Sequence, residues 1–433
     1  MKDFVNVGLL GAGTVGGGVL HVLERNSADI AKKVGKNIKI TKVFGRASEN
    51  LQEVYGDGYF YTANADDILN DPEIDIVVEL MGREHPAKEF MAQALANGKS
   101  VVTANKDVVA KYGKELFALA QEHGCDFMFE GSVAGGIPII QAMKSSLAAN
   151  KISSVMGIMN GTTNYMLSKM TKEHMGYAEV LKEAQEKGYA ESDPTADVGG
   201  FDAARKVAIL ASIAFNTRVS MDDVRIEGIE KIDLVDINYA KELGYAVKLL
   251  GIAKNDPEYG ISVCVHPTMI PESHPLANVN DAYNAIFVTG DAIGEAMFMG
   301  LGAGRYPTAS AVCADIIEAA RNILHDNRCR ITCTCYEEKH LCSSENMCAP
   351  CYIRMQVNDQ PGALAAIAAA FGAQNVSLRS VVQNRTVDGL AEIVVITHSV
   401  SEYSLQMALQ ILKVLPVVKE VCSIIRVEDN GLS

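Results

Sequence analysis

The stretch FVNVGLLGAGTVGGGVLHVL, residues 4–23, decides the fold of the first part of the chain. Its first residues alternate and then become continuously apolar, as a buried parallel strand does. A G-x-G-x-x-G pattern follows at once and leads into a helix, where glycines let the backbone and the helix N-terminus approach a pyrophosphate. The alternative is a Gly-rich turn without a ligand. The predicted dinucleotide site consists of Gly11, Gly13, Thr14, Val15 and Gly16.

The end of the second predicted strand, IKITKVFGR (residues 38–46), bears on the choice of cofactor. A site for NAD carries an acidic residue here to bind the ribose hydroxyls, whereas an arginine can pair with the 2′-phosphate of NADP. This strand ends in Gly45 and Arg46. We therefore expect NADP to be preferred, with NAD also possible; the alternative is that Arg46 is a solvated surface residue.

Strands and helices alternate through residue 150, which predicts a Rossmann-type doubly wound parallel sheet over residues 1–150. The segment TANK, Thr103 to Lys106, directly follows one of the predicted strands. Ligands of such sheets bind outside the carboxyl ends of the strands. Thr103 and Lys106 are therefore candidate cofactor-site residues.

The rest of the chain divides into further predicted parts. Residues 151–304 mix strands and long helices, as in an α+β substrate-binding and dimerisation domain, and a helix at about 305–325 is expected to return to the first domain. Residues 328–351 form a Cys-rich linker. Residues 352–433 follow the order β-α-β-β-α-β of a ferredoxin-like fold that could stand alone.

Composition and charge argue against several classes of protein. The 433 residues carry a net charge of −14 and no Lys/Arg-rich block, which disfavours binding to nucleic-acid phosphates. The first residues do not resemble a signal peptide, and no window approaches the ~20 apolar residues of a membrane span. We expect a cytoplasmic protein with neither a nucleic-acid nor a membrane partner.

Six of the ten cysteines lie in the predicted linker, from Cys329 to Cys351. Structural disulfides are not expected in a chain without a secretion signal. The window contains one C-x-C and one C-x-x-C, so a zinc or iron–sulfur site is one interpretation. Because the paired C-x-x-C pattern is absent, we expect free thiols in a metal-free linker.

The segment GYAESDPTADVGGFDAARK, residues 188–206, gathers carboxylates ahead of a single lysine. Asp202 and Lys206 are four residues apart on a predicted helix, where an ion pair adds about 0.3–0.5 kcal/mol to helix stability. The other interpretation is a site whose acids hold a cationic substrate while the lysine moves a proton. The carboxylates belong to Glu191, Asp193, Asp197 and Asp202.

Several motifs together resemble those of the homoserine dehydrogenase family. AQEKGYAESDPTADVGGFDAARK, residues 184–206, fits the family signature at nearly every specified position. The resemblance covers residues 1 to about 325, and the tail, with DQPGAL at 359–364, looks like an ACT domain, an amino-acid-binding regulatory module. Other motifs in the family's order are TANK (103–106), EGSVAGGIPII (130–140), GIMNGTTNYML (157–167) and GAGRYPTASAV (302–312).

The resemblance implies NAD(P)H-dependent reduction of L-aspartate 4-semialdehyde to L-homoserine, in threonine, methionine and isoleucine biosynthesis. By resemblance, Lys206 is the general acid/base, and Glu191 and Asp202 hold the substrate ammonium and hydroxyl. The alternative for Thr162 is a place in a helix cap, and the alternative for Gly188 and Gly302 is a role in turns. The further implied contacts are Thr162 and Asp197 with the substrate, and Gly188 and Gly302 with the cofactor. Lys106 is implied to be a catalytic residue that contacts both the cofactor and the active site.

The resemblance also implies a bound monovalent cation, usually sodium. In the family one carboxylate and three backbone carbonyls of the motif EGSVAGGIP bind it, and hard cations prefer such oxygen ligands. The alternative is a Gly-rich loop that only makes a tight turn. The matching positions are Glu130, Val133, Gly135 and Ile137.

The ACT-like tail implies regulation, with L-threonine as the inhibitor. The turn NDQPGAL opens a helix, so its backbone N–H groups can face an amino-acid carboxylate. The implied contacts are Asp359, Gly362 and, from a neighbouring chain, Asn375. Since ACT modules usually pair, we expect a homodimer or homotetramer, and we expect no fused aspartate kinase. The alternative is a tail that only aids assembly.

Two rival functions can be compared with this one. A dehydrogenase for another small amino-acid-like alcohol would need changes among Glu191, Asp202 and Lys206, and none is seen. A catalytically dead amino-acid sensor is disfavoured, because Lys206 and the nucleotide loop are intact.

Overall fold

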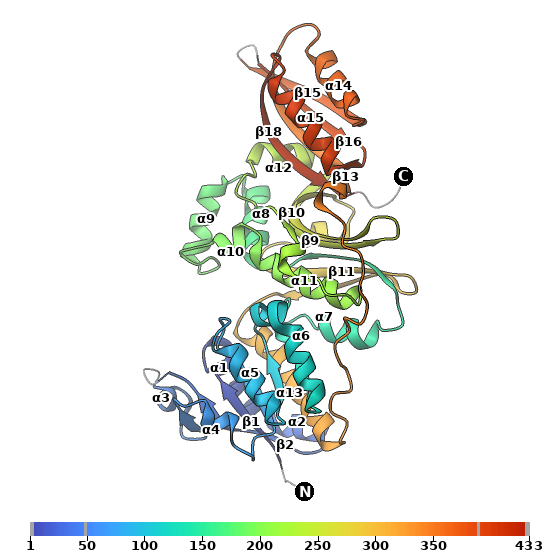
Figure 1. Cartoon of the computed structure of the whole chain (residues 1–433). Helices are drawn as coiled ribbons and strands as arrows, with labels where there is room; N and C mark the ends of the chain where they lie inside the picture. The colour runs from blue at the N-terminus through green and yellow to red at the C-terminus, as the bar shows by residue number, and fades with distance from the viewer. Residues whose placement is uncertain (1–3, 47–49, 388–389, 429–433) are drawn as a thin grey trace. The chain divides into compact units, whose positions relative to one another are not determined.

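The computed structural model describes residues 4–46, 50–387 and 390–428. The chain divides into two compact units, each assembled from segments far apart in the sequence (Figure 1). Helix α11 (Phe201–Ala214) begins in unit 2 and ends in unit 1. Unit 1 comprises Met1–Val155, Arg205–Asp222 and Asn284–Glu338, and unit 2 comprises Met156–Ala204, Asp223–Tyr283 and Lys339–Ser433.

A parallel sheet of six strands, in the order β3-β2-β1-β4-β5-β6, forms the centre of unit 1. The strand order reverses between β1 and β4, and in such sheets this switch point is where dinucleotides bind. The predicted doubly wound sheet is confirmed. The strands are β1 (Phe4–Leu10), β2 (Asn37–Phe44), β3 (Phe60–Thr62), β4 (Ile76–Glu79), β5 (Ser100–Thr103) and β6 (Phe127–Met128).

Helix α13 (Arg305–Leu324), from late in the chain, packs on α1 (Thr14–Arg25). Gly18 allows this close approach, because a Cβ there would lie 2.5 Å from the carbonyl oxygen of Arg305. Side chains of β1, β4, α1 and α13 share one hydrophobic core. The remaining helices of the sheet region are α2 (Ser27–Val34), α3 (Leu51–Tyr55), α4 (Asp66–Leu69), α5 (Ala87–Ala96), α6 (Lys106–Glu122) and α7 (Ile139–Gln141).

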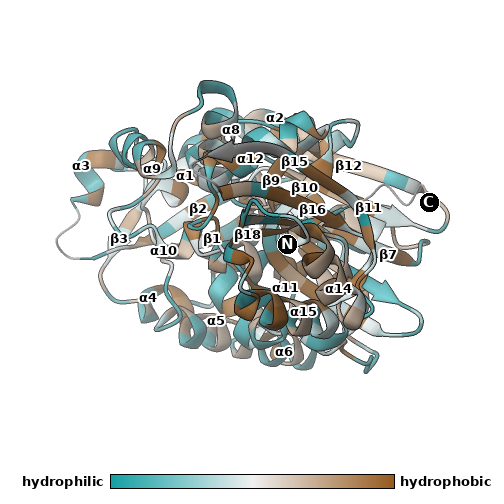
Figure 2. Cartoon of the chain, turned by 90° about the horizontal axis from the view of Figure 1, so that it is seen from above, coloured by the Kyte–Doolittle hydropathy of each residue, from teal (hydrophilic) through white to brown (hydrophobic). Residues whose placement is uncertain are grey.

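The strands β12, β11 and β7 lie next to one another in that order. β12 (Gly294–Leu301) is an edge strand whose alternate side chains are exposed. Figure 2 colours much of the strand surface brown, for hydrophobic residues, whereas loops are mostly teal. The neighbouring strands are β7 (Ile152–Ile158) and β11 (Tyr283–Gly290), and the exposed apolar residues of β12 are Met297, Met299 and Leu301.

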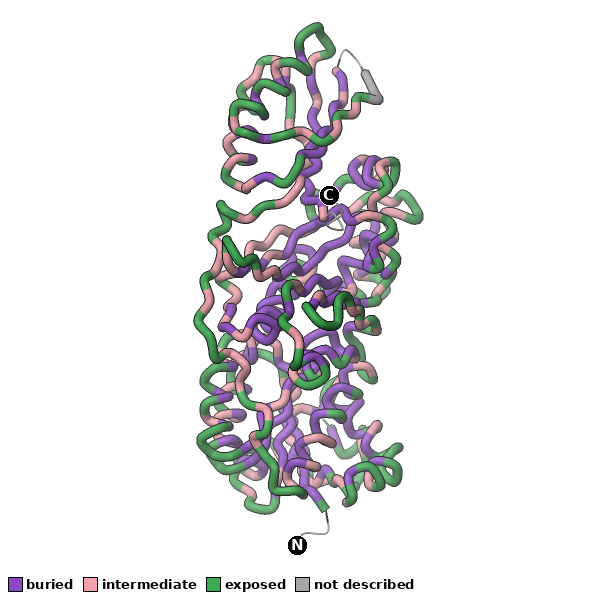
Figure 3. Tube along the Cα trace, turned by 90° about the vertical axis from the view of Figure 1, so that its right-hand side faces the viewer, coloured by how far each residue is buried: buried purple, intermediate pink, exposed green. Residues whose placement is uncertain are grey.

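Unit 2 contains a long antiparallel pair, β9 (Tyr245–Asp256) and β10 (Gly260–Pro271). The short strand β8 (Arg225–Ile226) pairs in parallel with β10. Buried residues, purple in Figure 3, run along these strands. The helices of this part are α8 (Gly161–Glu173), α9 (Tyr177–Glu186), α10 (Thr195–Val198) and α12 (Leu234–Glu242).

The tail has the predicted β-α-β-β-α-β order, with its sheet in the order β18-β14-β16-β15. Its helices pack with the strands around a separate hydrophobic core. The ferredoxin-like prediction is therefore confirmed. The elements are β14 (Cys351–Asn358), α14 (Ala363–Ala373), β15 (Leu378–Val387), β16 (Leu390–Thr397), α15 (Glu402–Val414) and β18 (Val418–Val427); β13 (Cys348–Ala349) and β17 (Val400–Ser401) form a separate short pair.

The tail is joined to the rest of unit 2 more closely than the sequence predicts. β18 pairs in parallel with β10, so the sheet of the tail continues into that of the substrate-binding part. Ion pairs reinforce the junction: Arg354 forms a buried pair with Asp236 of α12, and Arg426 and Arg225 both bond the partly buried Glu402. Burial alone would raise the pKa of Glu402, but the bond from Arg225 and the charge of Arg426 lower it to about 2.

Candidate active site

The glycine loop of unit 1 leaves space at the N-terminus of α1. Gly11 has a φ of 98°, and a Cβ there would lie 2.9 Å from the carbonyl carbon of Leu80. A Cβ on Gly16 would lie 2.1 Å from the carbonyl oxygen of Gly11. Both glycines are required by the local fold. A Cβ on Gly13, the N-cap of α1, would have no described neighbour within 4 Å, so this position borders open space that a pyrophosphate can fill.

Thr14 and Val15 are the first residues of α1, so their backbone N–H groups lie at the positive end of the helix. Arg46 lies beyond the end of β2, where it lines an open hollow of about 330 Å³ together with Gly45 and Tyr61. A hollow of this size with an arginine on its wall can accept a phosphorylated ribose. The residues present fit a dinucleotide.

The carboxyl edge of the sheet is held by a buried contact that sequence reasoning missed. Thr103, the last residue of β5, donates a hydrogen bond to Glu79 at the end of β4, with an O–O distance of 2.7 Å. Burial raises the pKa of Glu79. Asn105 caps helix α6, and Lys106 is the first residue of that helix. Lys106 therefore lies at this edge of the sheet. An acidic residue ending the apolar run IDIVVE was the available signal for Glu79.

Helix α11 is tied to α6 within unit 1 by an ion pair between Arg205 and Asp107, with an N–O distance of 2.6 Å. Lys206 follows directly and is only 8% exposed. Asp202, four residues earlier on the same helix, is 6% exposed. Residues four apart share a helix face, so α11 presents a buried carboxylate and a buried ammonium in one direction.

In unit 2 the structure brings together two of the four clustered carboxylates. The Nδ2 atom of Asn160 donates hydrogen bonds to Asp197 at 2.7 Å and to Asp202 at 3.0 Å. Asn160 was not predicted; it ends the apolar run of β7 and begins the motif NGTTN, which was the available signal. Asp193 instead accepts hydrogen bonds from the backbone and hydroxyl of Thr195 at the start of α10, and Glu191 is exposed.

Three other predicted positions have local roles. Thr162 donates a hydrogen bond to the carbonyl oxygen of Tyr189 at 2.6 Å, which holds the segment that starts at Gly188. Gly188 has a φ of 74°, in the left-handed region that favours glycine. In unit 1 a Cβ on Gly302 would lie 2.0 Å from Asn284. The side-chain amide of Asn284 is buried and has no hydrogen-bond partner among the described residues.

The loop from Glu130 to Ile137 has features that fit a monovalent cation. No described residue donates a hydrogen bond to the carbonyl oxygen of Val133 or Gly135, whereas that of Ile137 accepts one from Ile139. The Glu130 carboxylate accepts the backbone N–H groups of Ile140 and Gln141 at 2.8 and 2.7 Å. Carboxylate oxygens keep further lone pairs for a cation.

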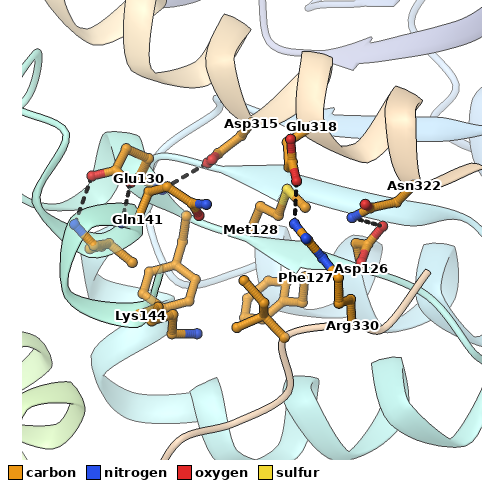
Figure 4. Close-up of a pocket in the computed structure, with 13 residues that line it drawn as sticks. Asp126, Phe127, Met128, Glu130, Gln141, Lys144, Asp315, Glu318, Asn322 and Arg330 are labelled. Carbon is orange, nitrogen blue, oxygen red and sulfur yellow. Dashed lines mark hydrogen bonds and ion pairs between the residues drawn. The ribbon is translucent and has the colours of Figure 1, made fainter. Parts of the chain in front are cut away.

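Asp315 of α13 accepts a hydrogen bond from the backbone N–H of Glu130 (Figure 4). Burial raises the pKa of both carboxyl groups. A cation beside this buried pair would favour its ionised form.

In the described part of the chain, no three His, Cys, Asp or Glu side chains group as metal ligands do. In the same described ranges, no helix has the length and apolar character needed to cross a bilayer.

The predicted regulatory positions of the tail lie at the two ends of α14. Gly362 is the N-cap of α14 and has a φ of 89°. Asp359 is exposed just before it, and Asn375, also exposed and with a φ of 56°, follows the end of the same helix. The residues at the N-terminus of α14 lie on the positive end of its dipole.

Comparisons with known proteins cover almost the whole chain. Models described as "Homoserine dehydrogenase", "Homoserine dehydrogenase, NAD binding domain" and "ACT domain" match residues 138–317, 11–130 and 352–417. Homoserine dehydrogenase of Bacillus subtilis strain 168 is 43% identical over 99% of each chain. The crystal structure of a homoserine dehydrogenase from Thiobacillus denitrificans matches with a TM-score of 0.93 and 43% identity over 98% of each chain. A hyperthermophilic archaeal homoserine dehydrogenase in complex with NADPH matches with a TM-score of 0.63 and 26% identity over 73% of this chain and 97% of that one. The chain therefore belongs to the homoserine dehydrogenase family and is an NAD(P)-dependent oxidoreductase.

Proposed function

We propose that the chain catalyses the reversible reduction of L-aspartate 4-semialdehyde to L-homoserine, in the biosynthesis of threonine, methionine and isoleucine. The observation that carries the proposal is the buried pair on one face of α11, Asp202 and Lys206. A carboxylate suits the cationic substrate, and a neighbouring ammonium can exchange a proton with the reacting oxygen. Family membership supports the same reaction.

Each residue then has a defined task. The Lys206 Nζ atom donates a proton to the carbonyl oxygen during reduction and takes it back from the hydroxyl during oxidation. Asp202, oriented by Asn160, binds the hydroxyl or ammonium of the substrate, and Asp197 supports this orientation. Glu191 completes the ammonium site. The nicotinamide cofactor, when bound, supplies or accepts the hydride.

NADP is the proposed preferred cofactor. Its 2′-phosphate pairs with Arg46, while its pyrophosphate lies against Gly13 and the first residues of α1. Thr103 and Lys106, at the carboxyl edge of the sheet, are the proposed cofactor contacts of this region. Gly188 and Gly302 are assigned to the cofactor by their match to the family motifs alone. The NADPH complex of the archaeal relative is consistent with this preference.

Sodium is the proposed occupant of the loop from Glu130 to Ile137, where it would hold the loop rigid through the carboxylate and the carbonyls of Val133 and Gly135. Replacing sodium by a bulky organic cation at constant ionic strength is expected to lower activity. Equal activity with both cations would count against the site.

Regulation and assembly complete the proposal. L-Threonine is the proposed inhibitor, with its carboxylate at the loop of Asp359 and Gly362 and its ammonium near Asn375 of a neighbouring chain.

A homodimer or homotetramer would cover the exposed methionines and leucine of β12. Light scattering tests this assembly; a monomer at assay concentration would contradict it.

The reaction itself is tested by mixing the purified protein with L-homoserine and NADP and following the absorbance of the reduced nicotinamide. Formation of reduced cofactor is the expected result. Reduction only with a different amino-acid-like alcohol would assign another dehydrogenase activity. No reduction with any such alcohol, together with threonine binding in calorimetry, would indicate a sensor.

A further inference from the structure

Two cysteines that the active site does not use, Cys333 and Cys335, lie side by side in unit 1. The chain bends at Thr334, and this bend is fixed by the Asn216 side chain, which donates a hydrogen bond to the Thr334 carbonyl oxygen at 3.2 Å. The backbone N–H of Glu337 donates to the carbonyl oxygen of Asn216 at 2.9 Å. Held in this way, the two side chains are two residues apart on the bend and line the same cavity.

The two sulfurs face a cavity of about 20 Å³ with a positively charged wall. Lys144 and Arg218 both line it, and among the described residues no carboxylate does. The ammonium of Lys144 lies 4.6 Å from the ring centre of Phe117. Burial lowers the pKa of Lys144 to about 8, although Cys333, Cys335 and the carboxylates of Asp315 and Glu130, which line the pocket of Figure 4, oppose this shift. Arg218 is fixed by a hydrogen bond of 2.8 Å to the carbonyl oxygen of Ala110.

This environment divides the two thiols into an attacking and a resolving group. The hydrogen bond from Cys335 lowers the pKa of Cys333 to about 6 despite partial burial, and the charges of Lys144 and Arg218 act in the same direction. The same hydrogen bond, with burial, raises the pKa of Cys335. The two shifts favour the thiolate at Cys333 and the thiol at Cys335. Both are partly accessible to a small oxidant.

We propose that Cys333 and Cys335 form a redox-active dithiol, which a hydroperoxide oxidises to an intrachain disulfide that slows turnover. The Cys333 thiolate attacks the peroxide, the O–O bond breaks, and hydroxide leaves as a sulfenic acid forms. The Cys335 sulfur then attacks the sulfenic sulfur, the S–O bond breaks, and water leaves with the thiol proton. Two electrons pass from the dithiol to the peroxide, and a small thiol reverses the reaction by exchange.

The effect on turnover follows from what the thiols contact. The Cys335 thiol also lies 3.8 Å from the carbonyl oxygen of Ser212, toward the end of α11, the helix that carries Lys206. The disulfide has no S–H donor and no thiolate charge, so both the contact with α11 and the attraction to Lys144 are lost. Since one hydrogen bond is worth ~0.5–1.5 kcal/mol, we expect kcat to fall about two- to ten-fold. This consequence depends on the proposed dehydrogenase activity; the chemistry of the dithiol does not.

The experiment follows peptide mass and activity together in the full chain. Trypsin releases Ile331–Lys339, ITCTCYEEK, in which Cys333 and Cys335 are the only cysteines. After treatment with hydrogen peroxide we expect this peptide to lose two hydrogens, kcat to fall, and dithiothreitol to reverse both changes. Cys333→Ser should be insensitive, and Cys335→Ser should stop at a sulfenic acid that dimedone labels. Cys348→Ser, which changes an exposed cysteine outside the cavity, is the matched control and should respond like the unaltered chain.

Two outcomes would overturn the proposal. The peptide could keep both thiols while other cysteines are oxidised, or the disulfide could form without any change in kcat. Failure of the untreated protein to oxidise homoserine would instead contradict the proposed function, and the peptide measurement would still report on the dithiol.

Discussion

Asp236 and Arg354 form a two-pronged ion pair in the interior of unit 2, with N–O distances of 2.7 and 3.0 Å. Neither side chain is more than 7% exposed. Removing one partner leaves an uncompensated buried charge, so Arg354→Met is expected to lower the free energy of unfolding by about 3–5 kcal/mol. The double variant Asp236→Leu/Arg354→Met should recover part of this loss. Urea denaturation measures all three, and strict additivity of the single effects would contradict the pairing.

Lys206→Ala is expected to lower kcat by about 10²–10⁴-fold, because the proton must then come from water. NADP binding, measured by fluorescence titration, should be nearly unchanged. Lys182→Ala, on the exposed face of α9, is the control and should retain full activity. A Lys206 variant with near-normal turnover would remove this residue from the mechanism.

Arg46→Asp is expected to shift cofactor preference toward NAD, because an acidic residue suits free ribose hydroxyls and repels a 2′-phosphate. The measured quantity is the ratio of kcat/KM for the two cofactors. Arg25→Asp makes the same charge change at an exposed position at the end of α1 and should leave the ratio alone. If Arg46→Asp leaves the ratio of kcat/KM for NADP and NAD unchanged, the arginine points away from the cofactor.

Threonine is expected to inhibit the full chain, and a chain truncated after Arg330 should be active but insensitive. Because truncation also uncovers the edge of β10, the sharper test is Asp359→Ala with Asn375→Ala, which leaves the docking contacts in place. We expect the inhibition constant to rise by about 5–150-fold, the usual range of allosteric coupling. Lys413→Ala, exposed on α15, is the control. Unchanged inhibition in the truncated chain would locate threonine at the active site.

Elemental analysis of protein purified without added metal is expected to find no stoichiometric zinc or iron. The reason is the irregular cysteine spacing, together with the absence of any three-ligand cluster among the described residues. Zinc or iron in a fixed ratio to the chain would make the window from Cys329 to Cys351 a metal module. It would also leave the dithiol without a free attacking sulfur.

What could be predicted from the sequence depended on the range of the interactions involved. The strands of the parallel sheet and the tail follow from local periodicity, and the placement of Asp202 and Lys206 on one face of a helix follows from their spacing. The docking of the tail could not be predicted, because it depends on contacts such as that between Asp236 and Arg354, which are 118 residues apart in the sequence. Composition also could not separate the two carboxylates that meet at Asn160 from Asp193, which binds the nearby Thr195 instead.

The order in which unit 1 is assembled from the chain has a consequence for synthesis on the ribosome. The parallel sheet is complete near residue 128, yet α13, which covers α1, ends only at Leu324. At the usual ~5–20 residues per second, this delay lasts on the order of ten to forty seconds. During that time α1 and α2 already cover part of the sheet, but the part of the core that α13 completes stays uncovered. We therefore expect emerging chains to expose part of this apolar core until α13 has left the exit tunnel.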